Sequence, residues 1–230
     1  MPRSRRLFSI SVILFCCSCA LSQPAGYNGF APPRVDREGQ ALPKLTYTKL
    51  LKGSVPEYMS ITVDSNGSGK YEGRKVDDPP SSRPLKLSPP TTKRLFDLAA
   101  KLDNFRLPGI ESHKKVANLG AKTFTYEAAQ KKNQVEFNYT LNRDAQELSE
   151  LFERIGAVET HLEELQYAIK YDHLGLPQEL LQIQMDLNNK ALAEAELLVP
   201  TLDQIARNPR FLHLAQTRAQ DILQRLQNNR

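Results

Sequence analysis

Apolar residues recur at steps of three and four along one long segment, from Asp144 to His173, and this spacing predicts an amphipathic α-helix. The stripe consists of Leu148, Leu151, Ile155, Val158, Leu162, Leu165 and Ile169. Asp144 followed by Glu147 is typical of an N-terminal capping pair, and Gly175 lies where the helical pattern ends. A stripe of about six turns must be buried, so we expect it to pack on its own chain; a partner helix in a coiled coil is the alternative.

Upstream of this helix, apolar and polar residues alternate with a period of two, which predicts β-strands. Strands are expected at residues 45–50, 58–63, 70–73, 84–87, 122–127 and 134–140. The turn-forming residues at 64–69 predict a hairpin between the second and third strands. A helix that is capped by Ser88 and ends before Phe105 is predicted to cover one face of the sheet.

The chain after the long helix is predicted to remain helical. Segments 177–189, 192–207 and 211–227 each carry an apolar face, and Pro200 is expected to kink or break the second of them. Their short joints favour antiparallel helix hairpins; a short solenoid of helix pairs is the alternative, although no convincing internal repeat supports it. The predicted fold class is therefore α+β: an antiparallel sheet with one covering helix, followed by an all-helical C-terminal part built on the long amphipathic helix.

The first 22 residues have the three regions of a secretory signal peptide. Arginines precede an apolar run from Leu7 to Phe15, which is too short to span a bilayer, and the small residues Ala20 and Ser22 predict cleavage before Gln23. Lipoprotein processing, which would leave a lipid on Cys19, is the alternative. We therefore expect an exported protein, periplasmic or secreted, with four parts: a signal peptide (1–22), a flexible Pro- and Gly-rich lead (23–44), a sheet domain (45–141) and a helical domain (142–230).

Removal of the signal peptide changes the charge of the chain. Lys plus Arg falls from 31 to 28 against 26 Asp plus Glu, so the net charge falls from +5 to +2. Without a concentrated basic stripe, a nucleic-acid partner is not expected. All three cysteines lie before Gln23, so the mature chain is expected to have no disulfide, zinc–thiolate site or cysteine nucleophile.

Three segments together resemble a family of known architecture. The run from Pro56 to Gly73, the helix from Leu87 to Leu102 and the segment from Glu111 to Thr140 are similar to uncharacterised exported bacterial proteins with a small α+β domain followed by helices. The resemblance covers most of the mature chain. It implies the architecture and the export, and no activity.

Motifs that would assign a reaction are not found in the sequence: neither a Gly-x-Ser-x-Gly elbow, nor a phosphate loop, nor a dinucleotide fingerprint, nor His-Glu-x-x-His. His161 and Glu164 share a face of the long helix, with Glu159 and Glu163 nearby, in an arrangement that a metal could use. A solvated position at the edge of the stripe is the favoured interpretation of His161. His113 lies in a loop beside two lysines. We therefore predict no catalytic, cofactor-binding or metal-binding residue and no cofactor.

The predicted hairpin turn also has part of a calcium-loop pattern. Asp64, Asn66 and Ser68 occupy positions 1, 3 and 5 of such a loop, but Lys75 stands at position 12, where a bidentate glutamate is required. The segment is therefore interpreted as a turn.

Three functions are compatible with these patterns. The leading hypothesis is an exported, non-enzymatic envelope protein that acts as a protein-interaction or structural module; its partner would be another envelope protein or a second copy, and it would touch the membrane only through a lipid at Cys19. The second is a small-ligand or inhibitor-like binding module. Its cleft would be lined by Tyr58, Tyr71, Tyr126 and Tyr139, although packing in the core or at the sheet edge is the favoured interpretation of these tyrosines. The third is a hydrolase of unrecognised type around His113 or His161.

The signal-peptide prediction has a direct test. N-terminal sequencing of the exported protein is expected to begin at Gln23, because the small residues before it fit the cleavage site. A mature chain that begins with a lipid-modified Cys19 would instead establish the lipoprotein alternative.

Overall fold

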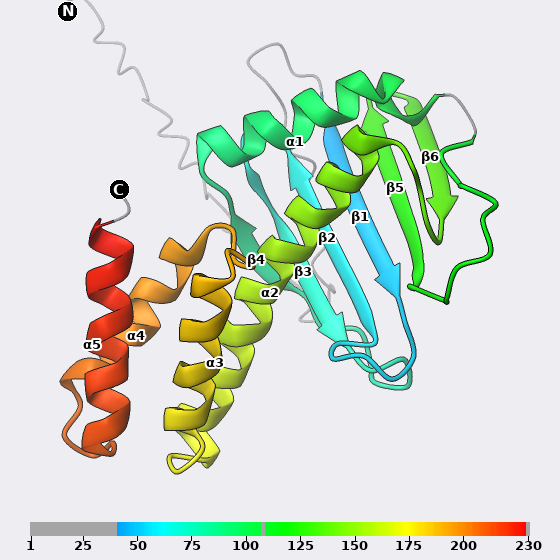
Figure 1. The fold of residues 1–230 in the computed structure, drawn as a ribbon. Coiled ribbons are helices and arrows are strands. Elements are labelled where there is room, and N and C mark those ends of the chain that lie inside the picture. The colour runs from blue at the N-terminus through cyan, green and yellow to red at the C-terminus, as the bar shows by residue number, and fades with distance from the viewer. Residues whose placement is uncertain (1–40, 107–108, 229–230) are drawn as a thin grey trace, which may run out of the picture. The chain divides into compact units, whose positions relative to one another are not determined.

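The computed structural model describes residues 41–106 and 109–228, which all belong to one compact unit (Figure 1). The predicted signal peptide, Cys19, the cleavage before Gln23 and most of the lead at 23–44 lie outside these residues. The described residues form a six-stranded antiparallel sheet and five α-helices, and the C-terminal part is helical. The predicted α+β class is therefore confirmed.

The sheet has the order β4-β3-β2-β1-β5-β6, and every neighbouring pair of strands is antiparallel. Its strands are β1 (Lys44–Leu50), β2 (Tyr58–Asp64), β3 (Ser68–Arg74), β4 (Arg83–Lys86), β5 (Ala121–Ala128) and β6 (Lys131–Phe137). Alternation gives the sheet one apolar face, where Tyr47, Ile61 and Phe124 are fully buried. Its other face is polar, and Thr46 on β1 bonds Thr62 on β2 there through their hydroxyl oxygens, which are 3.0 Å apart.

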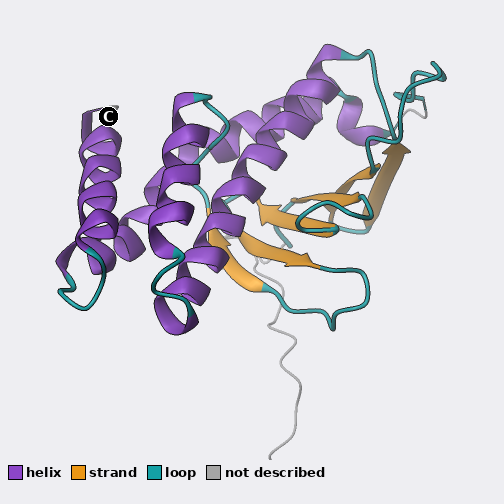
Figure 2. Cartoon of the chain, turned by 60° about the horizontal axis from the view of Figure 1, so that its bottom comes forward, coloured by secondary structure: helices purple, strands orange, loops and turns teal. Residues whose placement is uncertain are grey.

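Two helices lie over the apolar face, where the sequence predicted one (Figure 2). They are α1 (Pro89–Lys101), predicted as the cover, and the first half of α2 (Arg143–Tyr171). The ring of Phe152 on α2 stacks on that of Tyr47, with centroids 5.2 Å apart. The long amphipathic helix is therefore also part of the sheet's core.

The stripe of α2 is buried within the chain itself, and it serves two cores. Residues up to Ile155 pack with the sheet and α1, whereas residues from Val158 onward pack with the C-terminal helices. Leu148, Ile155, Val158 and Leu165 are fully buried, while Leu151, Leu162 and Ile169 are partly buried against these cores. No part of this stripe is left as a continuous surface for a coiled-coil partner.

The second core is closed by three further helices and a short 3-10 turn. They are α3 (Leu176–Asn188), η2 (Ala195–Leu198), α4 (Val199–Arg207) and α5 (His213–Asn228). Pro200 lies in the first turn of α4, so of the two predicted effects the break is observed. No helix among the described residues is long and apolar enough to cross a membrane.

Some predicted details are wrong at element boundaries. The cap of α2 is Asn142, whose side chain accepts a hydrogen bond from the backbone N–H of Ala145; Asp144 lies within the first turn. Strand β6 begins at Lys131, three residues before the prediction, because a tight turn at Ala129 (φ 51°) lets its polar start pair with the end of β5. Leu214, which the helical pattern of segment 211–227 places on the apolar face, is 53% exposed.

Two polar contacts join the sheet part to the helical part. The carboxylate of Glu194, after α3, accepts hydrogen bonds from the backbone N–H and the hydroxyl of Ser88, at 2.9 and 2.5 Å. Ser88 precedes α1, so this carboxylate lies at the positive end of that helix. Arg83 on β4 donates to the backbone oxygen and the carboxylate of Glu159 on α2, at 2.6 and 3.0 Å.

A helix shared by two cores predicts one cooperative unfolding transition. We expect Leu148→Ala, in the sheet core, and Leu165→Ala, in the helical core, each to lower the free energy of unfolding by about 2–5 kcal/mol, because each leaves a cavity. Both variants should shift a single transition, measured by urea unfolding followed by far-UV circular dichroism.

Glu150→Ala on the exposed side of α2 is the control and should change stability by no more than about 0.5 kcal/mol. Two separate transitions, each sensitive to only one of the two leucine variants, would contradict the shared core.

Candidate functional site

Two lysines occupy positions where the strand pattern places core residues. Lys49 follows Leu45 and Tyr47 on the inward phase of β1, and Lys122 precedes Phe124 on the same phase of β5. They are register partners across the β1–β5 pair. Like charges directly opposite each other destabilise a sheet, so this pair requires a counter-charge.

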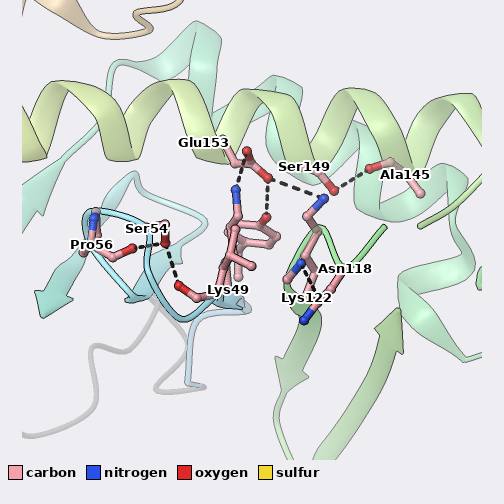
Figure 3. Close-up of polar contacts among 11 residues, drawn as sticks. Lys49, Ser54, Pro56, Asn118, Lys122, Ala145, Ser149 and Glu153 are labelled. Carbon is pink, nitrogen blue, oxygen red and sulfur yellow. Dashed lines mark hydrogen bonds and ion pairs between the residues drawn. The ribbon is translucent and has the colours of Figure 1, made fainter. Parts of the chain in front are cut away.

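Glu153 on α2 supplies that counter-charge from above the sheet (Figure 3). Its carboxylate accepts hydrogen bonds from the Tyr47 hydroxyl at 2.8 Å and from Lys49 Nζ at 2.9 Å, and Lys122 Nζ lies 3.8 Å away. The side chains of Lys49 and Lys122 are 23% and 14% exposed. One carboxylate therefore offsets two ammonium groups that are largely withdrawn from water.

The pKa values in this cluster follow from burial and from the three charges. Burial raises the pKa of Glu153, but the hydrogen bonds from Lys49 and Tyr47 and the charges of the two lysines outweigh it, and the net pKa is lowered. Burial lowers the pKa of Lys122, and the charge of Lys49 adds to this effect despite the opposing pull of Glu153. Burial, followed by the charge of Glu153, raises the pKa of Tyr47, which therefore remains a hydrogen-bond donor.

A pocket of about 160 Å³ opens beside this cluster, between α2 and the loop that joins β1 to β2. Its walls are mainly apolar, and Lys49 and Glu153 stand at one side. The remaining lining residues are Ser54, Val55, Pro56, Met59, Gly156, Ala157 and Thr160. A built cavity of about 150 Å³ accommodates a molecule the size of benzene, so this pocket suits one apolar side chain or one small ligand.

The end of the sheet beside the pocket exposes apolar side chains, of which Val55 lines the pocket itself. Val55 is 82% exposed in the β1–β2 loop, and Leu50 is 41% exposed at the end of β1. Leu119, also 41% exposed, precedes Ala121, the register partner of Leu50. Exposed apolar residues next to a pocket are typical of binding surfaces.

The pocket could recognise a ligand that carries an apolar group beside an anion. Glu153 already accepts from Tyr47 and Lys49, whereas an ammonium group has three N–H donors and Lys49 has one hydrogen bond to this carboxylate. The cluster keeps one excess positive charge, so a carboxylate is favoured over a cation. Lys122 does not line the pocket itself and acts on it through the shared Glu153.

His161 lies elsewhere, and its predicted solvated position is wrong. Its side chain is 9% exposed and is held between Glu179 and Asp186 of α3, not by Glu164. Glu159 and Glu163 pair with Arg83 instead. Among residues 41–106 and 109–228, no group of three or more metal-ligating side chains is arranged to hold a metal ion.

His113 is exposed in the loop before β5, and the nearby Glu111 is bound to the backbone N–H of Asn138 at 2.6 Å. In the described part of the chain, no hydrogen bond joins a histidine ring nitrogen to a serine or threonine hydroxyl. The loop with the partial calcium pattern is a turn: the Asp64 carboxylate accepts from the backbone N–H groups of Asn66 and Ser68.

The four tyrosines proposed for a ligand cleft do not line the pocket. Tyr71 is fully buried in the sheet core, where burial raises its pKa to about 12, and its hydroxyl lies 3.1 Å from that of Thr160. Tyr58 lies under the guanidinium of Arg74. Tyr71 and Tyr126 pack in the sheet core.

Sequence reasoning missed Lys49, Lys122 and Glu153, although one signal was present. Both lysines interrupt an otherwise apolar phase of a strand, which is unusual because lysine is rarely buried without a partner. The partner itself could not be identified, since Glu153 is one of several glutamates along the long helix.

No protein-family model matches the chain, and no curated protein matches it.

The shared carboxylate should be the most sensitive member of the cluster. We expect Glu153→Gln to lower the free energy of unfolding by about 1–2 kcal/mol, because it leaves two facing ammonium groups without a counter-charge. Lys122→Met should be near neutral or stabilising, because it removes a desolvated charge and the repulsion from Lys49.

Urea unfolding of the two single variants and of the double variant at pH 7 measures both effects and their coupling. A Glu153→Gln variant as stable as the parent, or a Lys122→Met variant that is the less stable of the two, would contradict this account of the cluster.

Proposed function

We propose that this chain is an exported, non-enzymatic binding module that holds a protein partner of the cell envelope. The partner inserts an apolar side chain into the pocket between α2 and the β1–β2 loop, and places a carboxylate near Lys49. The export part of this proposal rests on the signal-peptide pattern before Gln23.

One observation carries the binding site: two inward lysines share one carboxylate at the wall of an apolar pocket whose mouth exposes Val55. Net stability alone would be served as well by apolar residues at both strand positions, since replacing buried ion pairs by apolar side chains is often neutral or stabilising. The excess positive charge favours an acidic group on the partner. The exposed apolar side chains favour a protein surface over water.

A hydrolase has less support. His161 is bound by two carboxylates of α3, and His113 lies in an exposed loop outside the pocket. A general base must be within hydrogen-bond reach of a nucleophile, and neither histidine is so placed in the described residues.

A second candidate is a small carboxylate ligand with a short apolar group, because the pocket volume is close to what such a group fills. The same lysines would bind it. It differs from the protein partner in leaving Val55 uncovered at the mouth.

Site-specific crosslinking in cells tests the proposal. We place a photo-reactive amino acid at Val55 in the exported protein and, as a matched control, at Lys70 on the polar face of the sheet. One stoichiometric protein adduct is expected from position 55 only, with the attached peptide carrying an apolar residue next to an acidic residue or a C-terminus. Lys49→Met should lower the yield of this adduct several-fold. Lys52→Met, in the loop that carries Val55, should leave the yield unchanged.

Equal adducts at positions 55 and 70, or an adduct at 55 that is insensitive to Lys49→Met, would overturn the site. If no protein adduct forms and the NMR signals of the pocket residues shift when benzoate is added, the small-ligand candidate would be established in its place.

A further inference from the structure

His161 is buried at the contact between α2 and α3 with both ring nitrogens bound to carboxylates. Nδ1 lies 2.6 Å from Glu179 Oε1, and Nε2 lies 3.0 Å from Asp186 Oδ2. Seven residues separate the two acids, which is about two turns of α3, so both carboxylates are on the face that meets α2. The ring bridges them.

This geometry requires one proton more than a neutral histidine supplies. A neutral imidazole has one N–H donor and one acceptor nitrogen, whereas a carboxylate only accepts. Two carboxylate acceptors, one at each nitrogen, therefore need two N–H groups, and imidazole is the more basic partner, with ordinary values of about 6.5 against about 4. The bridge is complete when the ring is an imidazolium.

The charges around the ring also favour the protonated imidazole. Burial lowers the pKa of His161, but the hydrogen bonds and charges of Glu179 and Asp186 outweigh it, and the net pKa is raised. On α2, Glu164 is exposed one turn further on, and Arg83 of β4 is already paired with Glu159 and Glu163. In the described part of the chain, no charged side chain of η2 or α4 is bonded to the ring.

We propose that His161 holds a buried proton that fastens α3 to α2, and that loss of this proton as the pH rises loosens the helical core. The device is independent of the pocket, since neither His161 nor its two acids line it. A deprotonated ring leaves one carboxylate facing a nitrogen lone pair, so one of two bonds becomes repulsive.

The sign of the pH dependence follows from linkage. A histidine whose pKa is higher in the folded than in the unfolded state contributes stability that is fully present below the unfolded value, about 6.5. This contribution is lost as the pH rises through the folded value. The helical part should therefore weaken as the pH rises above about 6.5, the opposite of a histidine that is buried in its neutral form.

NMR spectra of the imidazole nitrogens in the folded full chain test the proposal directly. At pH 6.5 both nitrogens of His161 are expected to be protonated, and the ring should titrate above this pH. Glu179→Gln and Asp186→Asn should each move the titration to lower pH, because each removes one negative acceptor. Glu164→Gln, which changes a glutamate on α2 that has no bond to the ring, is the matched control and should leave the titration unchanged.

Urea unfolding midpoints between pH 6 and pH 9 give the second readout. The parent should lose stability with rising pH more steeply than His161→Gln, which cannot hold the second proton. A ring with a single N–H at pH 6.5, a titration that neither acid variant moves, or parallel stability profiles for the parent and His161→Gln would each overturn the proposal. The spectra of the parent decide it even where the glutamine variant fails to fold.

Discussion

One helix, α2, has to satisfy two cores at once, and the rest of the molecule is arranged around this constraint. Its stripe turns from the sheet and α1 to the C-terminal helices between Ile155 and Val158. A straight amphipathic helix presents one apolar face, so the two cores must lie end to end along that face. The sheet core and the helical core are consequently joined by one continuous helix. The contacts of Glu194 with Ser88 and of Arg83 with Glu159 join them further.

Along this helix, buried or partly buried polar residues fix which element packs where. Glu153 meets β1 and β5, Glu159 meets β4, and His161 meets α3. Apolar contacts alone tolerate sliding, because they are not directional. A largely buried charge loses stability when its partner is removed, so each of these groups penalises a shifted register of α2 more than it adds to net stability. Burial raises the pKa of Glu159 in spite of Arg83, which agrees with a group retained for position more than for energy.

The fold class could be predicted from the sequence because burial of one face imposes a local pattern: alternation in a strand and a spacing of three and four residues in a helix. The sequence located β1, β2, β5 and α2 for that reason. It misplaced β6, whose polar start is set by pairing with β5, and it assigned the cap of α2 to Asp144 where Asn142 serves. The candidate site could not be predicted for a related reason. Strand register brings Lys122 opposite Lys49, and helix docking brings Glu153 to Lys49 from 104 residues away. A local sequence pattern specifies neither the register nor the docking. His161 was placed on the surface because its carboxylate partners lie on a different helix.

The position of the pocket follows from the same constraint on α2. Gly156 and Ala157, which line it, fall at the point where the stripe changes from one core to the other. A Cβ added at Gly156 would lie 2.2 Å from the sulfur of Met59, so the glycine lets the helix approach β2 closely at this point. Beyond it the small side chains leave space that neither core fills, and the loop with Val55 closes only one side. The pocket therefore lies where α2 passes from the sheet core to the helical core.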